Sequence, residues 1–173
     1  EELGVAPRSQ TETFVAMKLR IDNWRWSGVP FYLRTGKRLS ERTTEVHIQF
    51  KRPPIQLFHG AGVNVLTSNV LTFKIQPDEC IILHFETKIP GLDMKLAPTS
   101  LEFDYEKRFG RSLKTGYETL LFDVMTGDTT LFQRSDQIEY GWRIVQPILD
   151  FWLEPKSENN IEKYESYSEG PQS

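Results

Sequence analysis

The sequence predicts an α+β fold in which a large, mostly antiparallel β-sheet is followed by helices that pack on one face of the sheet. Three observations lead to this prediction. Apolar and polar side chains alternate over the first two thirds of the chain, short polar turns separate the alternating segments, and helical spacing replaces the alternation near Tyr117. Alternation with a period of two is typical of strands with one buried face, and short turns favour antiparallel neighbours.

Several segments alternate in the way that strands do. The clear candidates for strands are residues 14–21, 43–50, 70–76, 80–86 and 101–105, and the weaker ones are 29–34 and 92–96. Residues that favour turns separate them, among them Pro77-Asp78 and Pro90-Gly91. One face of the sheet is therefore predicted to be buried, and the other to be polar or to meet a partner.

Two helices are predicted in the last third of the chain. The first has Gly127 where a C-terminal cap is expected, and its apolar residues are Tyr117, Leu120, Leu121 and Val124. The second begins at Ser135 or Asp136, and Asp136 with Glu139 is typical of a capping box. An apolar stripe that we interpret as core runs along the second helix, formed by Ile138, Trp142, Val145, Leu149 and Trp152.

Pro147 lies within this stripe. Because proline lacks a backbone N–H, it either kinks a continuous helix or ends one helix where another begins. After Pro155 the chain becomes polar and acidic. We therefore expect one domain over residues 1–155 and a polar, extended tail over residues 156–173.

The composition is that of a folded, globular protein. The chain has 173 residues, of which 38% are hydrophobic and 26% charged, and its net charge is −3. This acidic balance argues against non-specific nucleic-acid binding, which needs a strongly basic surface. The apolar runs are far shorter than the roughly 20 residues that cross a bilayer, and one cysteine excludes an internal disulfide framework. We expect a cytoplasmic protein that binds neither nucleic acid nor membrane.

The residues do not assemble into a metal site or a catalytic centre. His47, His59 and His84 are scattered, whereas a tight metal site needs three or four converging ligands. Cys80 lies in an alternating apolar segment, which predicts a buried structural thiol rather than a nucleophile. The sequence also lacks the glycine-rich strand-to-helix motif that binds dinucleotides.

The strongest local feature is a cationic segment at residues 34–42, RTGKRLSER, which carries four cations and one carboxylate. It joins two predicted strands, and Gly36 permits a sharp turn. Lys37 and Arg42 are at most about 18 Å apart even in an extended chain, so a turn can bring both to one phosphate. The alternative is a solvated turn whose charges keep the edge of a sheet soluble.

A second unusual segment contains two tryptophans around an arginine, at Trp24, Arg25 and Trp26. These rings can stack on a base or a sugar. The alternative, which we favour, is that the two tryptophans share one sheet face and pack in a core or an interface.

Several motifs together resemble the C-terminal domain of glucose-6-phosphate dehydrogenase of the bacterial type. The longest is NWRWSGVPFYLRTGKRL at residues 23–39, and the others are TETF at 11–14, EVHIQF at 45–50, IQPDE at 75–79, YETLLFD at 117–123 and WRIVQPI at 142–148. The similarity runs in order over residues 4–155.

This resemblance implies an enzyme that oxidises D-glucose 6-phosphate to 6-phosphogluconolactone with NADP, the first step of the oxidative pentose phosphate pathway. The family's coenzyme-binding and catalytic residues belong to an N-terminal domain that this sequence lacks, so no catalytic residue is expected here and the chain alone is expected to be inactive. The family's substrate contacts correspond to Lys37, Arg42 and Gln76. A non-enzymatic sugar-phosphate-binding or assembly module is the alternative, and a nucleic-acid binder is opposed by the acidic charge.

The resemblance also has consequences for the coenzyme and for assembly. NADP is expected to bind mainly to the N-terminal domain. Some relatives hold a second, structural NADP, for which Arg34 and Lys74 are suitable cations, but Thr43, His47 and Glu169 stand where further cations would be needed. We therefore expect no strong structural NADP site. Members of the family pair through the open face of the sheet, which implies a homodimer or homotetramer, and the polar faces of the strands here still carry Val70 and Ile82.

Overall fold

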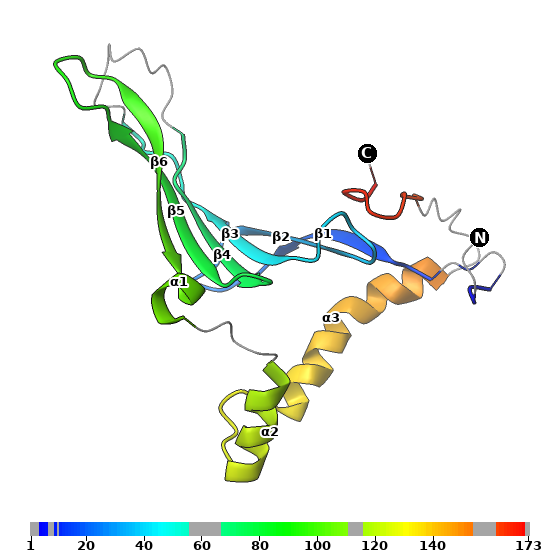
Figure 1. Cartoon of the computed structure of the whole chain (residues 1–173). Helices are drawn as coiled ribbons and strands as arrows, with labels where there is room; N and C mark the ends of the chain where they lie inside the picture. Colours follow the sequence, from blue (N-terminus) through cyan, green and yellow to red (C-terminus); the bar gives the residue numbers. More distant parts are fainter. Residues whose placement is uncertain are drawn as a thin grey trace. The chain divides into compact units, whose positions relative to one another are not determined.

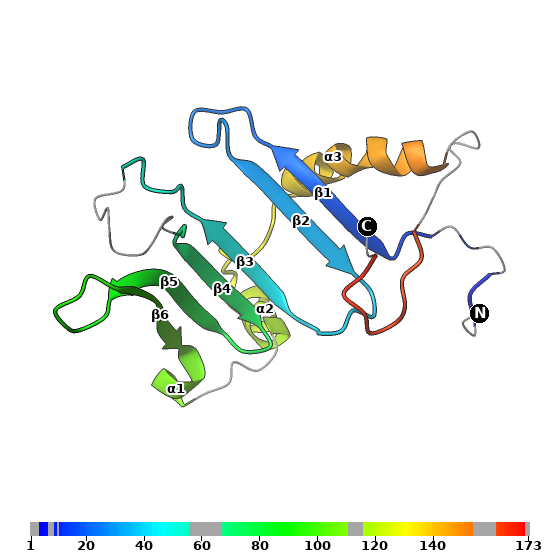
Figure 2. The ribbon, with the colours of Figure 1, turned by 90° about the horizontal axis from the view of Figure 1, so that it is seen from above.

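A computed structural model describes residues 4–6, 9, 11–55, 67–110, 116–153 and 162–171. These residues form two compact units. The first comprises Glu1–Glu41 and Tyr117–Ser173, and the second comprises Arg42–Gly116. Figures 1 and 2 show the strands and helices of each unit.

The first unit contains a two-stranded antiparallel sheet. Its strands are β1 (Phe14–Arg20) and β2 (Pro30–Gly36), and the register runs from Phe14 opposite Gly36 to Arg20 opposite Pro30. The strand β1 was expected from its clear alternation. The strand β2 confirms the weaker candidate at residues 29–34.

A turn rather than a strand holds the two tryptophans that precede β2. The side-chain oxygen of Asn23 accepts hydrogen bonds from the backbone N–H groups of Arg25 and Trp26, at 3.1 and 2.9 Å. Trp24 is fully exposed, and Trp26 packs edge-to-face on Phe31 with their ring centroids 5.3 Å apart. The prediction that the two tryptophans share a sheet face is wrong, because an asparagine that satisfies turn amides ends the strand before them.

The second unit contains a four-stranded antiparallel sheet in the order β3-β4-β5-β6. Its strands are β3 (Thr44–Gln49), β4 (Val70–Gln76), β5 (Cys80–Lys88) and β6 (Leu96–Asp104). The register aligns a row of apolar residues on one face, Val46, Phe73, Ile81 and Phe103, and the neighbouring row faces the other way, Glu45, Lys74, Cys80 and Asp104. The α+β class is confirmed, with the antiparallel strands distributed over two sheets.

The weak strand candidate at residues 92–96 is wrong except for its last residue. The backbone N–H of Ile89 donates to the carbonyl oxygen of Lys95 at 2.8 Å, which closes the hairpin between β5 and β6. Lys88 donates from its ammonium to the carbonyl oxygen of Gly91 at 2.7 Å, and Gly91 has a φ of 144°. Leu92 therefore lies fully exposed in a loop.

The described residues in the later part of the chain form three helices, α1 (Tyr105–Phe109), α2 (Gly116–Thr126) and α3 (Ser135–Leu153). Gly127 follows α2 with a φ of 75°, which confirms its role at the helix end. The helix α3 begins at Ser135 as predicted and continues through Pro147, so the alternative of two separate helices is wrong. None of the described helices is long and apolar enough to cross a membrane.

The start of α3 differs from the predicted capping box. Gln137 accepts a hydrogen bond at its side-chain oxygen from the backbone N–H of Arg134, at 3.1 Å. This is the bond that a capping-box glutamine makes to the residue before the helix, two positions earlier than the predicted pair of Asp136 and Glu139. Because the helix already starts at Ser135, Asp136 lies inside its first turn.

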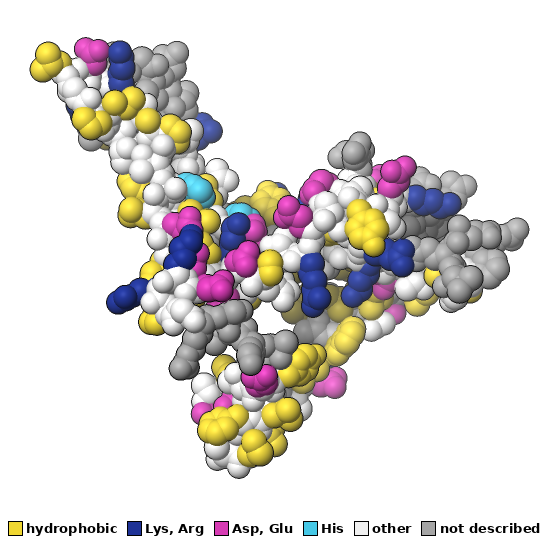
Figure 3. Space-filling model, in the orientation of Figure 1, with side chains coloured by type: hydrophobic (Ala, Val, Ile, Leu, Met, Phe, Trp, Pro, Cys, Tyr) yellow, Lys and Arg dark blue, Asp and Glu magenta, His cyan; other side chains and the backbone are white. Residues whose placement is uncertain are grey.

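The apolar residues of α2 and α3 remain largely uncovered. Among the described residues, the extensive contacts are those between neighbouring strands, and α1 makes a few contacts with the adjoining β6. The predicted packing of the late helices on a sheet face is not seen there. Trp142 in the predicted core stripe of α3 is 58% exposed, and Leu121 on α2 is 65% exposed. Figure 3 shows hydrophobic side chains gathered on the surface of α2.

The short helix α1 was not expected from the sequence. Asp104 caps it, since its carboxylate accepts a hydrogen bond at 2.9 Å from the backbone N–H of Lys107. Gly110 ends it in a left-handed conformation with a φ of 64°. The strand predicted at residues 101–105 thus ends one residue early, because Asp104 caps the helix and Tyr105 is the first residue of α1.

The cap of α1 gives a prediction for the pH dependence of this end of the sheet. The hydrogen bond from the Lys107 backbone N–H, followed by the one from its ammonium, lowers the pKa of Asp104. A lowered pKa in the folded state means that the ionised cap stabilises α1 above the unfolded pKa of about 3.9 and is lost as the pH falls through the folded value. Nuclear magnetic resonance should show the Lys107 amide shifting only below about pH 4.

An Asp104→Asn variant is the control for this titration. Its side-chain amide oxygen still caps the helix but does not titrate, so the acid shift of the Lys107 amide should disappear. An equal acid shift in both proteins would contradict the role assigned to the Asp104 carboxylate.

Candidate functional site

The cationic segment begins where β2 ends. Gly36 is required there because a Cβ at this position would lie 2.7 Å from the ring of Phe14. The backbone N–H of Lys37 then donates to the carbonyl oxygen of Thr13 at 2.8 Å, and Arg38 turns the chain with a φ of 50°. The exposed Lys37 side chain is therefore attached to a backbone whose position is fixed by β1 and β2.

Residues 162–171, the C-terminal segment, lie alongside this turn and pair with its backbone. Leu39 and Ser168 form a parallel β-bridge, in which the N–H of Ser40 donates to the Ser168 carbonyl oxygen at 2.9 Å. The N–H of Tyr167 donates to the carbonyl oxygen of Arg38 at 2.6 Å. The loop that carries Lys37 is thus completed by residues that lie 127 or more positions further along the sequence than their partners in the loop.

Two side chains of the C-terminal segment add further contacts to the loop. The hydroxyl of Tyr164 donates to the Lys37 carbonyl oxygen at 2.7 Å, and it also lies 3.0 Å from the carbonyl oxygen of Thr13. The carboxylate of Glu169 accepts a hydrogen bond from the hydroxyl of Ser40. Sequence reasoning did not predict these contacts. The signals for them were the aromatic residues within an otherwise polar stretch and the resemblance of residues 164–171 to a stretch of the family.

Glu169 also faces Arg34, one of the two cations predicted to suit a second coenzyme. The Arg34 guanidinium lies 3.6 Å from the Glu169 carboxylate, with both side chains more than half exposed. An exposed ion pair of this kind contributes little to stability. It nevertheless places an anion of the protein itself beside the cation.

The second unit brings Arg42 and Gln76 to one end of its sheet. Gln76 is the last residue of β4 and pairs with Thr44, the first residue of β3, two residues after Arg42. The side-chain amide of Gln76 donates to the Thr44 hydroxyl at 2.7 Å, and the Thr43 hydroxyl donates to the Gln76 carbonyl oxygen at 3.2 Å. Arg42 is exposed at this end.

Lys74, the other predicted coenzyme contact, also lies beside a carboxylate. Its ammonium is 3.7 Å from Glu45, whose other carboxylate oxygen is 3.0 Å from a ring nitrogen of His47. The second ring nitrogen of His47 lies 3.0 Å from the Thr72 hydroxyl. These contacts form one polar network on the face of the sheet opposite to the apolar row.

Cys80 lies on the same face and is 7% exposed, as expected for a structural thiol. Burial raises the pKa of the Cys80 thiol, and the nearby carboxylates of Glu102 and Asp104 raise it further. A thiol with a raised pKa is a poor nucleophile at neutral pH. The described residues contain no group of three or more potential ligands that could hold a metal ion, and His59 lies outside them.

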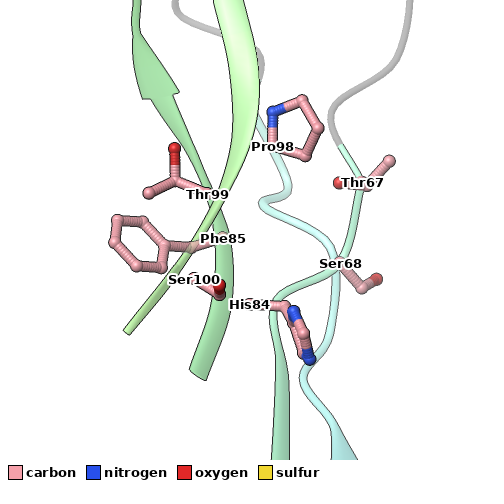
Figure 4. A pocket seen from close by; sticks show the side chains of 7 residues that line it. All are labelled: Thr67, Ser68, His84, Phe85, Pro98, Thr99 and Ser100. Atoms are coloured by element: carbon pink, nitrogen blue, oxygen red, sulfur yellow. The ribbon is translucent and has the colours of Figure 1, made fainter. Parts of the chain in front are cut away.

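A hollow of about 270 Å³ lies next to β5 and β6, apart from the predicted site residues. Figure 4 shows that its lining combines hydroxyl side chains, including Thr67 and Ser100, with Phe85 and the imidazole of His84. None of the described residues that line it is a lysine, arginine, aspartate or glutamate. The described lining thus contains no lysine or arginine for a phosphate.

Comparison with known proteins decides the family. A sequence model described as "Glucose-6-phosphate dehydrogenase, C-terminal domain" matches residues 1–173. The chain belongs to this family. The resemblance predicted from the motifs, of which the longest runs from Asn23 to Leu39, is confirmed.

Curated relatives place this domain within longer glucose-6-phosphate 1-dehydrogenases. The enzyme of Treponema pallidum is 49% identical over 158 residues, which are 91% of this chain and 31% of the relative. The enzyme of Borreliella burgdorferi is 45% identical over 171 residues, which are 99% of this chain and 34% of the relative. The chain thus spans about a third of the length of the curated relatives it matches.

Solved structures show that the glucose-6-phosphate dehydrogenase similarity extends to the fold. A glucose-6-phosphate dehydrogenase in complex with its substrate glucose-6-phosphate matches with a TM-score of 0.77 at 33% identity, over 93% of this chain and 32% of that one. The enzyme from Mycobacterium avium matches with a TM-score of 0.77 at 34% identity, over 98% of this chain and 34% of that one.

The structure locates the predicted contacts of this C-terminal domain within their own units. Arg34 and Lys37 belong to the first unit, whereas Arg42, Lys74 and Gln76 belong to the second. The convergence of Lys37 and Arg42 on one ligand stays a prediction. So does the boundary between residues 1–155 and a tail over 156–173, of which residues 156–161 and 172–173 lie outside the described residues.

Proposed function

We propose that this chain is the C-terminal part of an NADP-dependent glucose-6-phosphate dehydrogenase that oxidises D-glucose 6-phosphate to 6-phosphogluconolactone. The match of residues 1–173 to the family's C-terminal domain is the observation that carries this proposal. The chain supplies contacts to the substrate and a sheet for assembly. The remaining two thirds of the protein supply the main coenzyme site and the catalytic groups.

Lys37 and Arg42 bind the anionic end of the substrate in this proposal. A lysine ammonium is a compact charge on a flexible stem, and an arginine guanidinium is a planar fork that matches phosphate oxygens. Lys37 supports this role because its backbone is fixed on both sides while its side chain is exposed. The two contacts position the sugar so that its C1–H faces the nicotinamide, which lowers the entropic part of the barrier.

Gln76 contributes an uncharged contact to the sugar. A carboxamide both donates and accepts hydrogen bonds, which suits a hydroxyl group of a hexose. Gln76 lies at the end of β4 opposite Thr44, which follows Arg42 by two residues in the sequence. This placement supports a shared site for Gln76 and Arg42.

NADP is the coenzyme in this proposal, and we infer that the chain has no strong second site for it. Arg34 and Lys74 are the cations suited to such a site, and each already faces a carboxylate, Glu169 and Glu45 respectively. A phosphate that bound beside either carboxylate would meet like-charge repulsion.

The proposed assembly is a homodimer or homotetramer that forms through the polar face of the sheet. Ile82 is paired with Thr72 and Glu102 on this face, and Val70 with Gln49 and His84. These two apolar side chains among polar ones suit an interface between soluble subunits. The acidic charge and the absence of a membrane-crossing helix among the described residues are compatible with the proposed cytoplasmic location.

The direct test uses the full-length protein that contains this chain. We expect reduced nicotinamide to accumulate when glucose 6-phosphate and NADP are both present, and not when either is left out. Binding of glucose 6-phosphate without any coenzyme reduction would instead favour a non-enzymatic sugar-phosphate-binding module.

A further inference from the structure

Lys37 is held by a residue that the sequence places far from it. The Tyr164 hydroxyl lies 2.7 Å from the Lys37 carbonyl oxygen and 3.0 Å from the Thr13 carbonyl oxygen. The Thr13 carbonyl oxygen also accepts the N–H of Lys37, at 2.8 Å. Both backbone polar groups of Lys37 are thus bound within one small cluster formed by Thr13, Lys37 and Tyr164.

Tyr164 is itself held in a defined place by its ring. The ring packs edge-on against Phe14, with centroids 5.7 Å apart and the ring planes at 61°. The ring of Phe14 in turn lies close to Gly36 and Gly170, since a Cβ added at either position would come within 2.7 Å of it. The Tyr164 hydroxyl that contacts Lys37 therefore belongs to a side chain whose ring is held by packing against Phe14.

A fixed backbone matters for a lysine that binds an anion. The lysine stem has four carbons and many rotamers. The position of the ammonium is therefore poorly defined unless the Cα from which the stem extends is held in place. The hydrogen bond of the Lys37 N–H to Thr13 and that of the Lys37 carbonyl oxygen to Tyr164 together reduce the volume through which the ammonium moves. This lowers the entropic cost of holding a ligand at one position.

We propose that Tyr164 is a positioning residue for Lys37 and that its hydroxyl sets the affinity for the phosphorylated sugar without touching it. This inference rests on the proposed function, because Lys37 must bind the substrate for its placement to matter. It assigns the C-terminal segment a role in substrate binding, whereas the composition of this segment predicted only a polar, extended tail.

The test removes only the hydroxyl, in the full-length protein. In Tyr164→Phe the ring and its contact with Phe14 remain, so the fold is expected to be preserved. The KM for glucose 6-phosphate should rise about three- to tenfold, as expected for the loss of one hydrogen bond, with a smaller change in kcat. Tyr167→Phe is the matched control, because it removes an exposed hydroxyl from the same segment for which the described residues show no hydrogen bond. Its KM should be unchanged.

A double-mutant cycle shows whether Tyr164 acts through Lys37. In a Lys37→Ala background the Tyr164→Phe change should raise KM no further, because the ammonium that it positions is gone. A KM unchanged by Tyr164→Phe, or equal increases with and without Lys37, would overturn the positioning role while leaving the proposed function intact. A KM that Lys37→Ala itself leaves unchanged would overturn the proposed role of Lys37, and the positioning role with it.

Discussion

Replacing Lys37 with alanine in the full-length protein should lower kcat/KM for glucose 6-phosphate about 10- to 100-fold, the range for losing a hydrogen bond to a charged group. In the proposed site the ammonium is the group that contacts the substrate. Its removal leaves an exposed position, so the fold should not change. Steady-state kinetics should place most of the effect in the KM for the sugar phosphate and little in the KM for NADP.

Arg20→Ala is the matched control for this charge removal. Arg20 is an exposed cation at the end of β1 in the same unit, opposite Pro30. If Lys37 acted only by general attraction between its positive charge and the anionic substrate, the Lys37→Ala and Arg20→Ala variants would lose similar activity. Similar losses would contradict a specific contact at Lys37, whereas an unchanged Arg20→Ala enzyme supports it.

Replacing Gly170 with alanine should detach the C-terminal segment from the cationic loop. Gly170 has a φ of 99°, which side chains rarely adopt, and an added Cβ would lie 2.7 Å from the ring of Phe14. Strain and overlap together should cost about 2 kcal/mol or more. The backbone amides of Ser40 and Tyr167, which bond across this contact, should exchange with solvent about 30-fold faster.

The same substitution at Gly141 should have the opposite effect. Gly141 lies inside α3, where an added Cβ meets nothing within 4 Å. Alanine there should stabilise the helix by about 0.5–1 kcal/mol and leave the exchange of the Ser40 and Tyr167 amides unchanged. Unchanged exchange of these two amides in Gly170→Ala would show that the C-terminal segment is not held by the packing described here.

Local patterns predicted most of the strands and both long helices. Alternation is directly imposed by a sheet with two different faces, so β1, β3, β4 and β5 follow from it. Two of the errors fall where one polar side chain overrides the pattern. Asn23 turns the two tryptophans out of a strand, and Asp104 starts a helix at Tyr105.

Long-range contacts could not be predicted in the same way. The Lys37 loop was identified from its charges, but nothing local indicates that Tyr164 and Glu169 would bind it. Such contacts depend on how two distant segments meet around Phe14. The apolar stripe of α3 was interpreted as core although Trp142 within it is largely exposed, because periodicity shows that a face is apolar without showing what covers it.

The most direct test of the central claim compares glucose 6-phosphate with glucose as substrates of the full-length protein. If Lys37 and Arg42 recognise the phosphate, then Lys37→Ala and Arg42→Ala should each reduce the ratio of the two kcat/KM values about tenfold or more. The value for glucose itself should stay unchanged. An equal fall in kcat/KM for both sugars, with the ratio preserved, would contradict phosphate recognition by this loop.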